Sequence, residues 1–203
     1  MKITWYGHSC FRLESAAGSV IFDPYERGSV PGMELPVGLS ADLVLCSHGH
    51  GDHNAASLVQ VSGQQTDYTV ETLFCWHDDA QGTKRGENLI RIVSGGGFRV
   101  AHLGDIGHML PDSQLKVLHG VDALLIPVGG FYTIDAATAK ALVDRIEPVV
   151  TFPMHYRGEG FGLEPIGTLS EYTSLCDNVE YLDTNTYELR RGEEPKTVVL
   201  RFA

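Results

Sequence analysis

A run of closely spaced histidines with one aspartate is the part of this sequence best suited to chemistry. His48 and His50 are separated by one glycine, and Asp52 and His53 follow after another glycine. Residues two apart in an extended segment point to the same side, so the first two imidazoles can bind one ion. The aspartate and the last histidine can then face a second ion beside it. Imidazole with carboxylate is a donor set for zinc, manganese or iron rather than calcium.

The elements that must hold this run are predicted from hydrophobic patterning. Residues 42–46 form a short apolar stretch that predicts a buried strand ending at the histidines, and residues 55–59 predict a short helix behind them. Ala139, Leu142 and Ile146 share one face of a predicted helix, with Asp135 as its N-cap. Further strands are predicted at 3–6, 10–13, 20–22, 89–93, 98–103, 123–128, 149–152 and 197–202, and a second helix at 166–175. Strands alternating with helices indicate an α/β sandwich of mixed sheets.

Composition limits the classes of function. The chain has 203 residues with a formal net charge of -11, so a basic surface for nucleic acid is not expected. An apolar stretch long enough to span a membrane is absent from the sequence, and no apolar segment of signal-peptide type opens it. Four cysteines without a C-x-x-C pair suit reduced thiols, which predicts a cytoplasmic protein. The length predicts a single domain over residues 1–203.

The histidine run at the end of a strand resembles the metallo-β-lactamase superfamily, and other parts of the chain match that pattern in order. Asp23 is similar to the family's early aspartate, which follows a strand. His77 is similar to the family's third histidine ligand of the first metal. Asp105 resembles the carboxylate that bridges both metals, and His155 the last histidine of the second metal. The resemblance covers roughly residues 1–157 and implies a four-layer αββα sandwich with the site at one edge of two facing sheets.

The resemblance also implies the ligand sets and the chemistry. One metal would be held by His48, His50 and His77, the other by Asp52, His53 and His155, with Asp105 and a water or hydroxide between them. Asp52 and Asp105 are the residues expected to be catalytic. Two divalent ions are implied, zinc first, with manganese or iron as alternatives. The hydroxide would attack a small substrate whose carbonyl or phosphoryl oxygen one metal polarises.

Finer features are similar to the branch typified by L-ascorbate-6-phosphate lactonase. They are Trp5-Tyr6-Gly7-His8-Ser9-Cys10, the Pro-Met-His-Tyr element and the segment from Ile126 to Gly130. This branch implies a small, anionic lactone, ester or phosphoester as substrate, and because its members form oligomers a homo-oligomer is left open. The charge and the lack of an apolar span predict no nucleic acid or membrane partner. The candidate substrate residues are His8, Lys84, Arg85, Tyr132 and Arg157. The alternative for His8 is a structural role in which its ring is hydrogen-bonded. The alternative for Lys84 and Arg85 is that they lie in a solvated turn without contact to substrate.

Residues that differ from those of related families exclude some reactions, but two other functions remain as alternatives. The common β-lactamases carry a cysteine where this chain has Asp105, and oxygen-reducing di-iron relatives carry a glutamate in place of His50. His102 is expected in the core or beside the ligands rather than on a metal. One alternative is a mononuclear iron redox enzyme of the thiol dioxygenase type on the same fold. The other is a metal-stabilised binding or assembly protein without catalysis, which would unfold when chelated.

Overall fold

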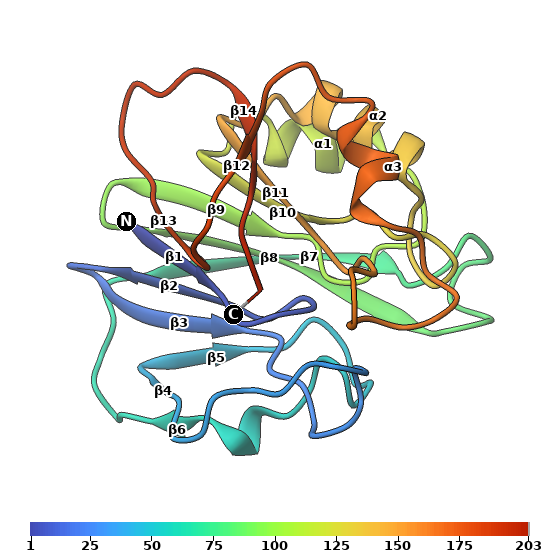
Figure 1. The fold of residues 1–203 in the computed structure, drawn as a ribbon. Helices are drawn as coiled ribbons and strands as arrows, with labels where there is room; N and C mark the ends of the chain where they lie inside the picture. Colours follow the sequence, from blue (N-terminus) through green and yellow to red (C-terminus); the bar gives the residue numbers. More distant parts are fainter. Residues whose placement is uncertain (203) are drawn as a thin grey trace.

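The computed structural model describes residues 1–202 and contains two main β-sheets that face each other (Figure 1). The first sheet has five strands in the order β13-β1-β2-β3-β5. Within it β1, β2 and β3 form an antiparallel meander, and β5 is parallel to β3. The bounds are β1 Lys2–Trp5, β2 Phe11–Ser15, β3 Gly18–Phe22, β5 Leu43–Leu45 and β13 Thr186–Glu188.

The second sheet has seven strands in the order β12-β14-β11-β10-β9-β8-β7. Its centre is parallel, because β10 pairs in parallel with both β9 and β11, whereas β7, β8 and β9 are antiparallel neighbours. The strands predicted at 89–93 and 98–103 are present as β8 and β9, which pair as an antiparallel hairpin. The bounds are β7 Thr69–Trp76, β8 Glu87–Gly95, β9 Phe98–His102, β10 Ala123–Pro127, β11 Val150–Met154, β12 Val179–Tyr181 and β14 Lys196–Val199.

The helices lie against the seven-stranded sheet, at the upper right of Figure 1. They are α1 Asp112–Leu118, α2 Ala136–Ile146 and α3 Leu169–Thr173. In α2 the predicted face is buried at Ala139, Leu142 and Ile146, and the Asp135 carboxylate accepts a hydrogen bond from Thr138 N at 2.8 Å, as an N-cap does. The predicted α/β sandwich of mixed sheets is therefore confirmed.

The side of the molecule beyond β5 has little regular structure. It carries the two-stranded sheet of β4 Ser40–Ala41 and β6 Gln60–Val61, and the 3-10 turn η1 Ala56–Leu58. The short helix predicted at 55–59 is therefore one 3-10 turn. Strand β5 was expected to be buried but is only half-buried, because it is the last strand of its sheet. The helix predicted at 166–175 is shortened to α3.

The direction of the strands explains how distant parts of the chain reach one place. Strands β1 and β3 run the same way because both are antiparallel to β2. Strands β7 and β9 run the same way because both are antiparallel to β8, and β11 shares this direction because β9 and β11 are both parallel to β10. The segments that follow their C-terminal ends therefore emerge at the same edge of each sheet. Those segments contain His8, Asp23, His77, Asp105 and His155, and the histidine run follows β5.

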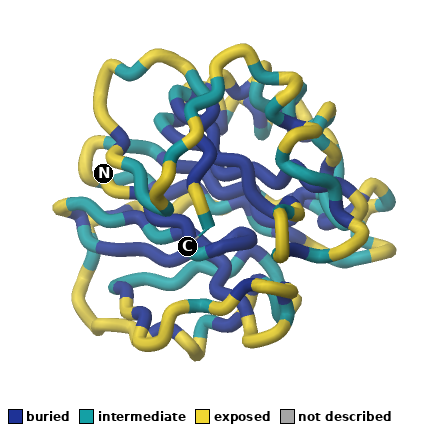
Figure 2. The backbone as a smooth tube through the Cα atoms, in the orientation of Figure 1, coloured by how far each residue is buried: buried dark blue, intermediate teal, exposed yellow. Residues whose placement is uncertain are grey.

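The core lies between and behind the sheets, where the tube in Figure 2 is dark. All five residues of β10 and of β11 are buried, as the central strands of a sheet covered on both faces must be. The exposed segments are mainly connections. Among residues 1–202, no helix has both the length and the apolar character needed to cross a bilayer.

Candidate metal centre

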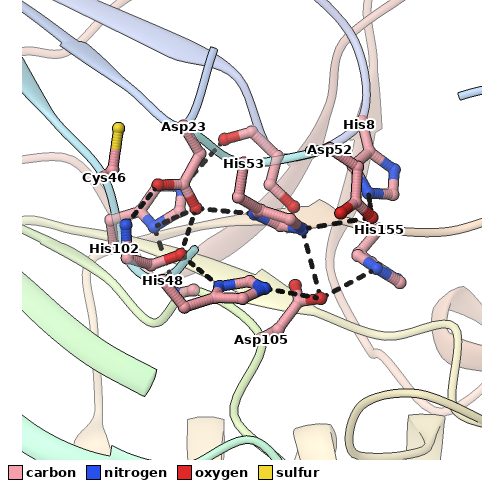
Figure 3. A network of polar contacts seen from close by, with 12 residues as sticks. His8, Asp23, Cys46, His48, Asp52, His53, His102, Asp105 and His155 are labelled. Carbon is pink, nitrogen blue, oxygen red and sulfur yellow. Dashed lines mark hydrogen bonds and ion pairs between the residues drawn. The ribbon is translucent and has the colours of Figure 1, made fainter. Parts of the chain in front are cut away.

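Seven histidine and aspartate side chains predicted to bind metal meet at this edge, together with His8. Figure 3 labels His8, His48, Asp52, His53, Asp105 and His155 among them. Donor atoms of His48, His50 and His77 lie within 4.8 Å of one another and form the first group. The second group contains His8, Asp52, His53 and His155 by the same measure. The structure thus brings together the two sets that the sequence resemblance implied, with His8 added to the second.

Asp105 lies between the two groups. Its Oδ2 atom is 3.1 Å from Nε2 of both His53 and His155, 3.4 Å from His77 Nε2 and 4.0 Å from His48 Nε2. The side chain is 2% exposed, and its Oδ1 atom has no hydrogen-bond partner. A carboxylate oxygen that faces imidazoles of both groups is placed as a bridging ligand would be.

Glycine makes the approach of Asp105 possible. Gly104 has φ +56°, and a Cβ atom there would collide with the side chains of Asn88 and Ser47. Asn88 in turn accepts a hydrogen bond from Asp105 N at 2.9 Å and donates one to Leu103 O at 2.8 Å. The buried amide therefore fixes the backbone that carries the central carboxylate.

Asp23 orients two of the histidines. Its Oδ2 atom accepts hydrogen bonds from His53 Nδ1 at 2.8 Å and from Ser47 Oγ at 2.6 Å, and its Oδ1 atom accepts one from Ser47 N at 2.6 Å. The single hydroxyl proton of Ser47 is thus used, so Ser47 Oγ must accept from His48 Nδ1, 2.9 Å away. In the neutral form of each imidazole the proton therefore lies on Nδ1, and Nε2 is directed at the centre as the nitrogen that can bind a metal.

The donor set fits divalent metal ions. Buried nitrogens without a hydrogen-bond partner include Nε2 of His8, His48, His53 and His155. Orphaned buried polar atoms are costly unless a ligand satisfies them. Two donors that bind one ion at 2.0–2.1 Å lie roughly 3.0–3.4 Å apart, which is close to the separations found around Asp105.

Burial and neighbouring charges give His48, His8 and Asp105 the protonation states that bind metal, whereas His53 must lose a proton. Burial lowers the pKa of His48 to about 3, and burial and then the neighbouring His155 lower the pKa of His8 to about 4, so both imidazoles are neutral at pH 7. Burial would raise the pKa of Asp105, but His155 and His53 hold it well below its usual range. Burial lowers the pKa of His53 and Asp105 raises it, with a net rise in the metal-free chain, so metal binding there displaces a proton.

A cavity of about 250 Å³ opens above the donor groups. Arg85 and Tyr132 are among its lining residues, and both also line a neighbouring hollow of about 590 Å³. Arg85 donates a hydrogen bond to Phe131 O at 3.0 Å, and its guanidinium carbon is 5.4 Å from the centre of the Tyr132 ring. A fixed cation therefore stands at the wall of the cavity. Its remaining lining residues are His50, Asp52, His77, Asp105, His155 and Leu163.

Asp78 shapes the loop that carries Arg85, a role the sequence analysis missed. Its buried carboxylate accepts four backbone hydrogen bonds, from residues 80, 82, 84 and 85, at 2.8–3.0 Å. Burial would raise the pKa of Asp78, but these backbone hydrogen bonds together lower it to about 2. An aspartate followed closely by glycine is typical of such side chain-to-backbone turns, so the signal was present.

The other predicted substrate residues lie elsewhere. Lys84 is exposed, pairs with Asp79 at 2.6 Å and lines only the neighbouring hollow. Arg157 is exposed and lines neither cavity, and its backbone N donates to Gly167 O. His8 is buried and is not among the residues that line the cavity.

His102 is placed as a core residue. It is fully buried, its Nε2 atom is 2.8 Å from Ser9 O, and its Nδ1 atom accepts a hydrogen bond from Gly104 N at 3.1 Å. With both ring nitrogens used, His102 ties the segment after β1 to the segment that carries Asp105. This agrees with the expectation that it supports the ligands from the core.

The two-sheet sandwich with histidines and aspartates at its strand ends defines a class of metalloprotein. The chain belongs to the metallo-β-lactamase superfamily, since residues 2–155 match the family model described as a beta-lactamase superfamily domain. The resemblance found in the sequence is thereby confirmed at the level of the superfamily.

Relatives of known name support the class of activity. A metal-dependent hydrolase of Archaeoglobus fulgidus is 33% identical over 193 residues, with 77% of this chain and 83% of the relative covered. One of Carboxydothermus hydrogenoformans is 29% identical over 191 residues, covering 77% and 84%. The crystal structure of a candidate zinc-dependent hydrolase of this superfamily from Thermotoga maritima has a TM-score of 0.80 and 32% identity, covering 98% of this chain and 97% of that one.

The family and these relatives support a metal-dependent hydrolase. These similarities reach the superfamily and a metal-dependent hydrolase, and the resemblance to the lactonase branch stays a prediction. A further hollow, of about 270 Å³, lies between Tyr25 and Leu58 and contains none of the donor residues. The chemistry therefore belongs to the cavity above the histidines.

Proposed function

We propose that this chain is a dinuclear metal-dependent hydrolase of a small anionic lactone, ester or phosphoester. The observation that carries the proposal is the position of Asp105 Oδ2, 3.1–4.0 Å from imidazoles of both donor groups. One group would hold an ion through His48, His50 and His77, and the other through Asp52, His53 and His155. Zinc is expected first, with manganese or iron as alternatives, because imidazole and carboxylate suit all three.

The roles of the side chains follow from where they lie. When bound, two divalent ions supply a nucleophilic hydroxide near neutral pH, by lowering the pKa of water from about 15.7 to roughly 7, and a Lewis acid for the substrate. Asp105 would neutralise part of the positive charge between the ions. Asp52 lines the cavity with its side chain 20% exposed, so it can receive the proton that the attacking water releases.

Arg85 supports an anionic substrate. It is the cation in the cavity wall, and its contacts with Phe131 and Tyr132 hold the guanidinium in place before a substrate arrives. A planar guanidinium pairs well with a carboxylate or phosphate because it offers parallel N–H donors. Tyr132 can contribute its hydroxyl to the same group.

Metal analysis is the first test. Elemental analysis of untagged protein purified without chelator is expected to give two zinc or manganese ions per chain, and hydrolysis should stop on chelation and return with metal. One iron per chain would redirect the assignment to redox chemistry. A chain that unfolds on chelation and hydrolyses no lactone, ester or phosphodiester would instead match the binding or assembly alternative.

The anion site is tested by comparing two adjacent cations. With bis(p-nitrophenyl) phosphate as the probe, Arg85→Ala is expected to raise KM by about 10–150-fold, since a charge-assisted hydrogen bond contributes about 1.5–3 kcal/mol. Lys84→Ala is the matched control and should leave KM near the wild-type value, because Lys84 is exposed and paired with Asp79. Equal effects of the two variants would contradict a specific role of Arg85.

A further inference from the structure

His8 stands in the second donor group without a role in the ligand sets described so far. It follows β1, its side chain is 0% exposed, and its backbone has φ +48°. Neither ring nitrogen has a hydrogen-bond partner. A buried imidazole with two orphaned nitrogens is expensive unless something else satisfies it.

The position of the ring points to that partner. His8 Nε2 is 3.3 Å from Asp52 Oδ2, close enough for a hydrogen bond but without the geometry of one. Its ring centre is 4.2 Å from that of His155 and 5.2 Å from that of His53. A separation of 3.3 Å falls in the range of roughly 3.0–3.4 Å expected for two donors that share one ion. Figure 3 shows His8 directed at this group.

The backbone holds His8 in this place. Its carbonyl oxygen accepts hydrogen bonds from Trp5 Nε1 at 3.0 Å and from His155 N at 3.5 Å, and its N–H faces Met33 Sδ at 3.1 Å. The left-handed φ is one that histidine adopts more readily than most residues. The fold therefore fixes the imidazole next to His155, and His8 is not among the residues that line the cavity.

We propose that His8 binds, through Nε2, the metal ion held by Asp52, His53 and His155. This inference rests on the two-metal centre proposed above. With the bridging Asp105, the second position has three imidazoles and two carboxylates, five protein donors, which is more than a tetrahedral zinc site accepts. The first position has three imidazoles and Asp105, and its His50 is exposed. The metal position formed by His8, Asp52, His53 and His155 should therefore bind its ion more tightly than the other position does. It should also favour a metal that takes five or six ligands.

The test measures metal binding rather than turnover. Chelator-treated wild type, His8→Asn and the control His119→Asn are titrated with Co²⁺ by calorimetry, and their visible spectra are recorded. Asparagine tolerates the left-handed backbone and can hydrogen-bond to Asp52, but it is a poor metal ligand. His119 is an exposed histidine outside both groups.

The expected result is that His8→Asn weakens binding of the tighter Co²⁺ ion by more than about 100-fold, beyond the 10–100-fold typical of residues that only support a ligand. Its visible spectrum should change because the coordination number changes, whereas His119→Asn should match the wild type. If His8→Asn binds two ions with wild-type affinity and spectrum, His8 only positions Asp52 and the proposal is wrong.

A measurement on the wild-type chain covers the case in which the variant does not fold. In a crystal structure of the Co²⁺-loaded protein, His8 Nε2 should lie about 2.0–2.2 Å from an ion. Two ions with His8 beyond 3 Å from both would overturn the role of His8 alone. One ion bound by His8 would contradict the dinuclear centre but keep this ligand, and one ion away from His8 would overturn both.

Discussion

Asp105→Asn is expected to lower the hydrolysis rate more than about 1,000-fold, equivalent to roughly 4 kcal/mol of barrier. The carboxylate faces imidazoles of both donor groups, and asparagine removes the negative charge while keeping the shape. Without that charge, two cations held close together repel each other, so the metal content should fall below two ions per chain. The measurements are kcat/KM on the same probe and elemental analysis.

The matched control is Asp79→Asn. Asp79 is close in sequence to His77 and lines the neighbouring hollow, but its side chain is 72% exposed and contacts Lys84 rather than a donor group. Its removal should leave rate and metal content unchanged. Full activity of Asp105→Asn with two ions bound would refute the bridging role. A melting curve in chelator shows whether either variant has lost its fold.

Asp23→Ala is expected to weaken metal binding by about 10–100-fold, the usual effect of removing a residue that orients ligands. The change leaves His53 Nδ1 and the Ser47 N–H without an acceptor in a buried place and frees His48 to adopt either tautomer. Binding of Zn²⁺ to chelator-treated protein, measured by competition with a chromogenic chelator, gives the affinity.

Asp42→Ala provides the comparison, because Asp42 makes similar bonds at the other end of β3. Its Oδ2 atom accepts from Ser19 N at 2.8 Å and from Ser19 Oγ at 2.9 Å, but no metal-binding residue is among these partners. This variant should lower stability and leave metal affinity intact. If both variants bind zinc as the wild type does, the hydrogen bonds of Asp23 do not prepare the site.

The sequence could predict the elements whose signals are local. The apolar face of α2 and its Asp135 cap repeat with helical spacing, and the β8–β9 hairpin is marked by glycines between two apolar runs. Strands β7, β12 and β13 were missed. Strand β7 is the last strand of its sheet and is mostly exposed. Strands β12 and β13 have three residues each and form only because a distant strand offers an edge: β14 for β12 and β1 for β13. Their pairing is a tertiary effect that local patterning does not contain.

By itself, the sequence determined which donors are present and their order along strand ends, because residue type and spacing carry that information. Only the tertiary structure decided which donors share a position. His8 joins His155 although 147 positions separate them, because β1 and β11 end at the same edge. Arg85 lines the cavity and its neighbour Lys84 does not. The backbone N–H groups of both residues donate hydrogen bonds to Asp78, and these bonds fix the conformation of the loop. Such choices depend on how two sheets pack, and packing is set by contacts between residues far apart in the chain.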